Sequence, residues 1–125
     1  MTIEASVEFS VSTWQQPLPP QPSPSRARVL DHLAEIVDSL GDHRLRIAID
    51  GLSASGKTSL GHELAQRLAR RGRPVFRASL NDFKRPWSER DLYDRVSGEG
   101  YYRNAFDHDA ACRLLLDPSD PAAEG

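Results

Sequence analysis

The chain has 125 residues, of which 38% are hydrophobic and 27% charged, so we expect one domain with a modest core. Its formal net charge of −2 excludes the positive long-range field that draws proteins to nucleic acid or anionic membranes. The single cysteine, Cys112, excludes an internal disulfide. The N-terminus lacks the basic start and apolar block of a signal peptide, and no apolar run approaches the ~20 residues that span a bilayer. We therefore expect a cytoplasmic chain with no nucleic-acid or membrane partner.

The first 24 residues are predicted to stand apart from the rest. Residues 3–11 alternate between apolar and polar side chains, which predicts a half-buried strand. Five prolines fall within residues 17–24, and this density disfavours both helix and central strand. Residues 1–24 are thus interpreted as a strand-like segment followed by an extended linker.

A helix is predicted to open the main domain, which we place at residues 25–118. Ser23 can cap the helix and Pro24 suits its first turn. The helix is expected to end at Gly41. Its apolar stripe comprises Leu30, Leu33, Val37 and Leu40.

A strand–helix–strand unit follows. Residues 44–50 place Leu45, Ile47 and Ile49 on one side and predict a short strand. Leucines at helical spacing predict a helix that ends at Gly72, and residues 74–80 predict a second strand. This order predicts a parallel crossover with a helix on one face of the sheet.

The remainder of the chain carries weaker signals. Residues 88–95 could form a short helix, and residues 97–104, with two glycines and two tyrosines, are typical of a loop. Asp107 can cap a final helix that Asp117-Pro118 stops. Residues 119–125 read as a polar tail.

The segment Gly51-Leu52-Ser53-Ala54-Ser55-Gly56-Lys57-Thr58 matches the phosphate-binding pattern G-x-x-x-x-G-K-[ST]. Gly51 permits a tight exit from the strand, and Gly56 lets the backbone approach a phosphate closely. Inward N–H groups and the dipole of the next helix favour an anion. Lys57 is predicted to reach the β- and γ-phosphates, and the Thr58 hydroxyl to hold Mg²⁺. The predicted nucleotide-binding residues are Gly51, Ser53, Ala54, Ser55, Gly56, Lys57, Thr58 and Ser59. A glycine- and serine-rich turn that merely caps a helix is the alternative.

Three blocks together resemble the uridine kinase-like branch of the P-loop kinases. They are residues 47–58, residues 79–86 (Ser-Leu-Asn-Asp-Phe-Lys-Arg-Pro) and residues 98–107 (Gly-Glu-Gly-Tyr-Tyr-Arg-Asn-Ala-Phe-Asp). The resemblance covers about residues 26–118. It implies ATP- and Mg²⁺-dependent phosphorylation of a hydroxyl on a nucleoside or similar small molecule.

The family's catalytic base is the Asp of an Asp-x-Phe or Asp-x-Tyr motif after the second strand. Here the matching position is Asn81, whose amide cannot take a proton, and Asp82 beside it is the nearest candidate base. An ordinary turn after a strand is an equal alternative for Asn81-Asp82. The catalytic candidates are Lys57 and Asp82. The candidate acceptor-binding residues are Asn81, Arg85, Tyr101, Tyr102 and Arg103, of which the resemblance places residues 101–103 in part of the acceptor pocket. The alternatives are that Lys84 and Arg85 form a solvated basic pair and that the two tyrosines pack under the loop as core.

The sequence therefore predicts an α/β fold, the front part of the three-layer P-loop kinase architecture with a parallel sheet. It is apparently truncated after the first strand–helix–strand unit, since the later strands that carry the second acidic Mg²⁺ site and lid arginines have no counterpart here. Three functions stay open: an ATP-dependent phosphotransferase, a non-catalytic nucleotide- or phosphate-binding protein, and a nucleotide-regulated switch without transfer activity. Self-association or a partner chain could complete the sheet.

Overall fold

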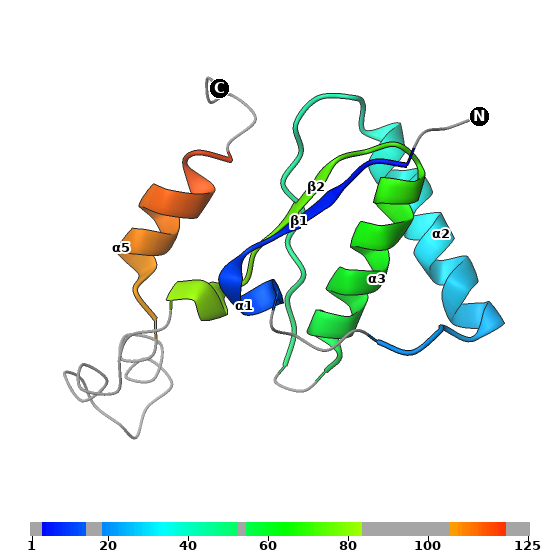
Figure 1. Cartoon of the computed structure of the whole chain (residues 1–125), viewed down its shortest axis with the longest axis horizontal. Coiled ribbons are helices and arrows are strands. Elements are labelled where there is room, and N and C mark those ends of the chain that lie inside the picture. The colour runs from blue at the N-terminus through cyan, green and yellow to red at the C-terminus, as the bar shows by residue number, and fades with distance from the viewer. Residues whose placement is uncertain (1–3, 15–18, 53–54, 84–105, 120–125) are drawn as a thin grey trace. The chain divides into compact units, whose positions relative to one another are not determined.

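The computed structural model describes residues 4–14, 19–52, 55–83 and 106–119. These residues divide into two compact units, each treated separately below. The first comprises residues 1–43 with 47–78, and the second residues 44–46 with 79–125. Figure 1 shows the strands and the two long helices of the first unit. The fold class is mixed α/β with a small parallel sheet.

The sheet of the first unit pairs the N-terminal strand with the strand that follows the long helices. Strand β1 (Val7–Phe9) lies parallel to β2 (Val75–Arg77), with Val7 opposite Val75. The ladder continues at both ends, because Val75 N donates to Ser6 O at 3.1 Å and Ser10 N donates to Arg77 O at 2.9 Å. Both strands are shorter than the alternation predicted, and the sheet is parallel as expected.

The predicted strand at residues 44–50 is wrong, and so is the crossover built on it. The structure has no strand there, and β2 pairs with β1 instead. Apolar alternation makes a strand only where a neighbour completes the hydrogen-bond ladder. Ile47, predicted to point inward, is 47% exposed.

A short helix ends the N-terminal strand earlier than predicted. Helix α1 (Val11–Trp14) begins where the predicted strand still continued. Thr13 is fully buried, and its hydroxyl donates to Ser10 O at 3.0 Å, with Arg77 O 3.3 Å away. Threonine bonds to nearby carbonyls in this way stabilise turns at the ends of strands.

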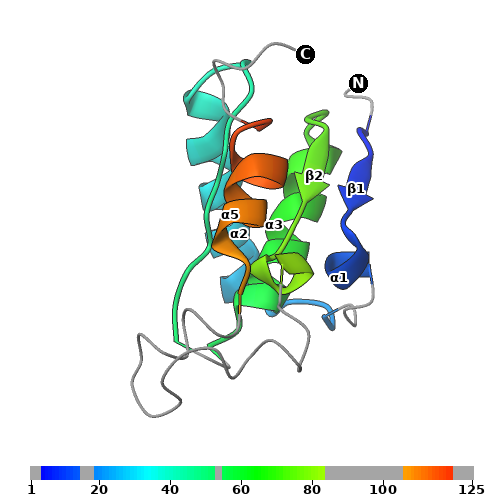
Figure 2. The same cartoon turned by 90° about the vertical axis from the view of Figure 1, so that its left-hand side faces the viewer.

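Helices α2 (Pro24–Ser39) and α3 (Lys57–Arg70) supply most of the core of the first unit. Ser23 caps α2 as predicted, because its hydroxyl accepts from Arg26 N at 3.2 Å. Figures 1 and 2 show α3 between the strands and α2. The buried apolar side chains of the two helices are Leu30, Ala34, Val37, Leu64, Ala65, Leu68 and Ala69.

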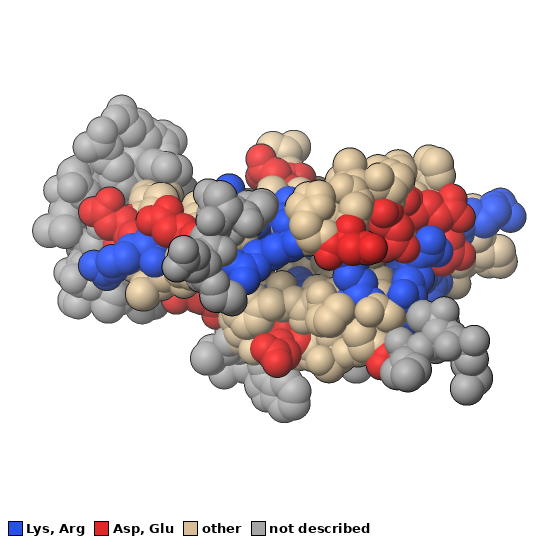
Figure 3. Space-filling model, turned by 90° about the horizontal axis from the view of Figure 1, so that it is seen from above, with Lys and Arg blue, Asp and Glu red and all other residues tan. Residues whose placement is uncertain are grey.

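Ion pairs join α2 to α3 and to the turn that follows α3 in the sequence. The carboxylate of Glu63, with a side chain only 6% exposed, receives Arg26 Nη2 at 2.7 Å and Arg26 Nε at 3.0 Å. Asp31 approaches Arg67, and Asp38 pairs with two arginines, Arg71 and Arg73. The arginine pairing lowers the pKa of Asp38. On the face drawn in Figure 3, acidic and basic side chains lie interspersed.

The second unit contains the turn η1 (Leu80–Phe83) and helix α5 (His108–Ala111), which runs on into a π-turn at Cys112–Leu116. Asp107 caps α5 as predicted, since its carboxylate accepts from Ala110 N at 3.0 Å. Asp107 N also donates to Phe83 O at 2.7 Å. The predicted helix at 88–95 and loop at 97–104 lie outside the described residues. None of the described helices combines the length and apolar character that crossing a bilayer requires.

Candidate functional site

The glycine-containing loop lies in the first unit and leads directly into α3. Asp50 Oδ1 accepts from Gly51 N at 2.8 Å, and Ser55 N donates to Leu52 O at 3.2 Å. These bonds bend the chain between residue 50 and the helix. Two of the predicted nucleotide-binding residues, Ser53 and Ala54, lie outside the described residues.

Gly56 is the residue from which α3 starts, and its backbone explains why it is glycine. Its φ of 94° is left-handed, a region that a Cβ disfavours. A Cβ added at Gly56 would meet nothing within 4 Å, so the requirement comes from the backbone and not from crowding. The left-handed turn directs the chain abruptly into the helix.

Lys57 lies back across the loop. Its Nζ donates to Gly51 O at 2.6 Å and to Leu52 O at 2.9 Å, so the ammonium closes the loop that precedes its own helix. A positive charge held by carbonyls can exchange these bonds for a phosphate at little cost, because both are hydrogen bonds to oxygen. Lys57 thus links the first turn of α3 to the start of the loop.

The first turn of α3 borders a hollow of about 290 Å³ lined by residues 55–59. Among the described residues, no side chain caps this helix. The N–H groups of an uncapped first turn need acceptors, and together with the helix dipole they favour an anion. The loop residues predicted from sequence at positions 55–59 therefore line one surface suited to a phosphate.

Thr58 is exposed and lines this hollow. In the described part of the chain, no three His, Cys, Asp or Glu side chains gather into a metal site. Mg²⁺ does not need such a cluster, because it commonly keeps several waters and binds through phosphates plus one or two protein oxygens. A single hydroxyl would fit this mode if phosphates were bound in the hollow.

Asn81 and Asp82 belong to the second unit. Asp82 Oδ2 accepts from Ser79 N at 3.0 Å, while Asn81 N donates to Ser79 Oγ at 3.1 Å. Both therefore take part in the turn η1, as the turn interpretation expects. Of the predicted acceptor residues, only Asn81 is described, since Arg85, Tyr101, Tyr102 and Arg103 lie outside the described residues.

Sequence reasoning missed the contact that positions α3 against the sheet. Arg77 on β2 lies against Gly61, where a Cβ would come within 2.6 Å of Arg77 Nη2. His62 is buried beside it, with its ring centroid 5.8 Å from that of Phe9. Burial, with the Arg77 charge adding to it, lowers the pKa of His62, and burial lowers the pKa of Arg77. A glycine inside an otherwise regular helix was the only sequence signal.

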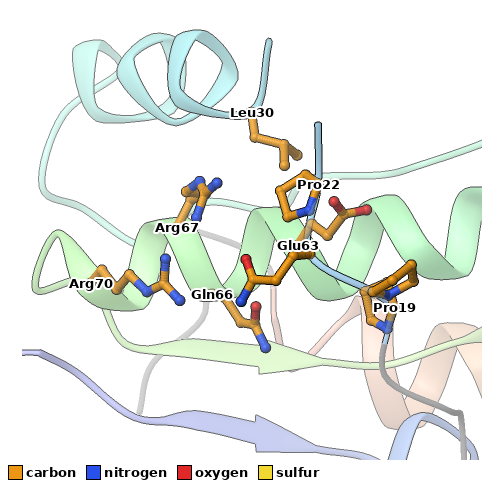
Figure 4. Close-up of a pocket in the computed structure, with 9 residues that line it drawn as sticks. Pro19, Pro22, Leu30, Glu63, Gln66, Arg67 and Arg70 are labelled. Atoms are coloured by element: carbon orange, nitrogen blue, oxygen red, sulfur yellow. The ribbon is translucent and has the colours of Figure 1, made fainter. Parts of the chain in front are cut away.

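A second hollow, of about 230 Å³, lies between the proline segment at residues 19–22 and helix α3 (Figure 4). Leu30, Glu63, Gln66, Arg67 and Arg70 complete its wall. Glu63 is neutralised by Arg26, and Arg67 approaches Asp31, so most of its charge is already compensated. No residue of the predicted loop lines it.

Comparisons of the chain with protein-family models, with curated proteins and with solved structures found no match. A functional assignment must therefore rest on the loop and the first turn of α3 themselves.

Proposed function

We propose that residues 51–59 bind the phosphate groups of a nucleoside triphosphate. The observation that carries this proposal is the uncapped start of α3 with Lys57 Nζ folded over the Gly51 and Leu52 carbonyls. An anion in the hollow accepts from the N–H groups of the first turn and draws Lys57 away from the loop carbonyls. The left-handed Gly56 supports the same interpretation, because it lets the backbone come close to the ligand.

The fuller proposal is an ATP-dependent phosphotransferase of the uridine kinase-like type within the P-loop fold. It rests on the resemblance of the three sequence blocks and on the loop geometry. Lys57 neutralises charge on the transferring phosphate, Thr58 holds Mg²⁺, and Asp82 takes the proton from the acceptor hydroxyl. Mg²⁺ supplies further charge neutralisation at the phosphates. The acceptor class is a nucleoside or a similar small molecule with a free hydroxyl.

A second candidate is a nucleotide- or phosphate-binding protein without transfer activity. The bond from Ser79 N to Asp82 Oδ2 favours it, because a carboxylate that accepts a backbone N–H is a weaker base. Asn81, at the position of the family's base, adds to this argument. The two candidates share the loop and differ only at Asn81-Asp82.

Calorimetric titration of the whole chain with Mg·ATP tests the shared part. Lys57→Ala should abolish binding, whereas Arg70→Ala, which removes the same charge from the last turn of the same helix, should bind like the wild type. A folded wild-type chain that does not bind Mg·ATP would contradict both candidates.

Release of ADP in the presence of nucleoside acceptors separates the two. Acceptor-dependent release that falls in Asp82→Asn supports the phosphotransferase. Tight Mg·ATP binding without release by any acceptor supports the non-catalytic protein.

A further inference from the structure

Asp50 and Lys57 bind opposite ends of one residue, Gly51. Asp50 Oδ1 accepts from Gly51 N at 2.8 Å, and Lys57 Nζ donates to Gly51 O at 2.6 Å. Because both bonds end on the same residue, the carboxylate and the ammonium lie within about one Debye length of each other, ~10 Å at 0.1 M salt. Among the described residues, neither side chain makes an ion pair. A negative charge therefore stands close to the ammonium at the start of α3.

Gly51 also lies against the wall of the hollow at the start of α3. A Cβ added at Gly51 would come within 3.0 Å of Ser55 Oγ and 3.8 Å of Lys57 Cδ. Ser55 and Lys57 both line the hollow. Asp50 is exposed and bonded to the backbone N of this same glycine, so its carboxylate stands beside the hollow. An anion bound in the hollow therefore experiences the charge of Asp50.

A carboxylate beside a phosphate site favours one form of the ligand over another. Like charges repel, and the repulsion grows with the charge of the ligand. A metal-free triphosphate carries more negative charge than its magnesium complex, because Mg²⁺ neutralises part of that charge. The Asp50 carboxylate therefore lowers the affinity for metal-free triphosphate more than the affinity for the magnesium complex.

We propose that Asp50 is a specificity residue, which makes the loop prefer magnesium-bound triphosphate to metal-free triphosphate. This inference rests on the proposed function, since it requires phosphates in the hollow lined by residues 55–59. Asp50 acts through its charge and not as a ligand of the metal. Its hydrogen bond to Gly51 N holds the carboxylate at the start of the loop, so the charge stays near the ligand.

Calorimetric titration of the whole chain with ATP, once with Mg²⁺ and once with EDTA, measures this preference as the ratio of two dissociation constants. Asp50→Asn removes the charge and keeps an oxygen that accepts from Gly51 N. It should bind metal-free ATP about 5-fold tighter than the wild type, and Mg·ATP within about 2-fold of the wild type. Asp50→Ala also loses the acceptor, and it should narrow the ratio by a similar factor. High salt should reduce the difference between Asp50→Asn and the wild type, because salt screens exposed charges.

Asp42→Asn is the matched control, because it removes the same charge from an exposed position far from the loop. Arg73, which follows α3 in the sequence, donates to Gly41 O at 2.7 Å and to His43 O at 3.1 Å. Asp42 therefore lies near the end of α3 opposite to the loop, and a helix of 14 residues separates the two ends by roughly 20 Å. The control should have the same ratio of dissociation constants as the wild type.

Several results would overturn the inference. If Asp50→Asn has the wild-type ratio, the ligand does not experience the Asp50 charge, although the proposed phosphate binding by the loop stands. A change in the ratio for Asp50→Ala alone would assign the effect to the hydrogen bond with Gly51 N. Weaker binding of Mg·ATP by Asp50→Asn, with metal-free ATP unchanged, would make Asp50 a magnesium ligand. A folded wild-type chain that binds neither form of ATP would contradict the proposed function and this inference together. Circular dichroism confirms that each variant is folded.

Discussion

The guanidinium of Arg77 on β2 rests directly on Gly61 of α3, so close that a Cβ at residue 61 would lie 2.6 Å from Nη2 and 3.1 Å from Cζ. The absent side chain lets the helix approach the strand. Since Gly61 lies one turn after Lys57 and Thr58, this contact also fixes where the first turn of α3 stands relative to the sheet.

Gly61→Ala should change stability little, because two effects oppose each other. Alanine gains about 1 kcal/mol of helix propensity over glycine, while moving the Arg77 guanidinium costs a similar amount. In an Arg77→Ala background the second effect is absent, so the same substitution should stabilise by ~0.5–1 kcal/mol. Urea denaturation of the four members of this cycle measures the difference. Equal effects of Gly61→Ala in both backgrounds would mean that Arg77 and Gly61 do not interact.

His62 should make the first unit sensitive to mild acid. Burial and the neighbouring Arg77 charge lower the pKa of His62 in the folded state, so the folded chain takes up its proton at lower pH than the unfolded chain. Stability should therefore be constant above about pH 6.5, the ordinary histidine pKa, and fall as the pH drops below it. Within the described part of the chain, the Phe9 ring and the Arg77 guanidinium lie near His62.

Unfolding midpoints of the wild type and His62→Gln between pH 5 and 8 measure this effect. The variant should lose the part of the pH dependence that lies below pH 6.5. His32→Gln, at an exposed position on α2, is the control and should retain the wild-type profile. If the unfolding midpoint of His62→Gln changes with pH as in the wild type, groups other than His62 cause the acid sensitivity.

Local signals in the sequence predicted α2, α3 and α5 well, but they missed α1 and predicted the sheet poorly. Ser23 and Pro24 mark the start of α2 through contacts within one turn, and Gly72, with φ of 86°, stands just after α3 as predicted. The strand expected at residues 44–50 had the right alternation. A strand also needs a segment to hydrogen-bond with, and β2 pairs with β1, almost 70 positions away in the sequence, and not with residues 44–50. The alternation of residues within one segment does not determine which distant segment it pairs with.

The candidate site shows the same division. Gly56, Lys57 and Thr58 could be proposed from sequence because the phosphate-binding pattern is contiguous and each position has a local reason, and their role at a phosphate stays a prediction. Arg77 was missed because its contact with Gly61 joins a strand to a helix sixteen residues earlier. The roles of Asn81 and Asp82 stay predictions, since their turn geometry is compatible with either proposed function.

The Arg26–Glu63 pair should contribute measurably to stability, because Glu63 is buried and would otherwise keep an uncompensated charge. Arg26→Ala should lower the melting temperature by several degrees. Arg70→Ala is the matched control, since Arg70 is exposed and makes no ion pair within the described residues. Differential scanning calorimetry at neutral pH measures both. A second variant, Arg26→Ala with Glu63→Gln, also removes the unpaired charge of Glu63 and should recover part of the lost melting temperature. If the melting temperature does not recover, the unpaired Glu63 carboxylate is not what destabilises Arg26→Ala.

Thr58 should affect nucleotide binding only when magnesium is present. If its hydroxyl holds Mg²⁺ beside the phosphates, Thr58→Ala should weaken the affinity for Mg·ATP about 10-fold, and Thr58→Ser should preserve it. ATP titrated in the presence of EDTA should bind both variants and the wild type equally, because Lys57 and the N–H groups of the first turn are unchanged. An equal loss with and without magnesium would instead place the Thr58 hydroxyl on a phosphate oxygen, and the metal would then need another protein oxygen or none. Lys57→Ala completes the comparison, since it should weaken ATP in both conditions.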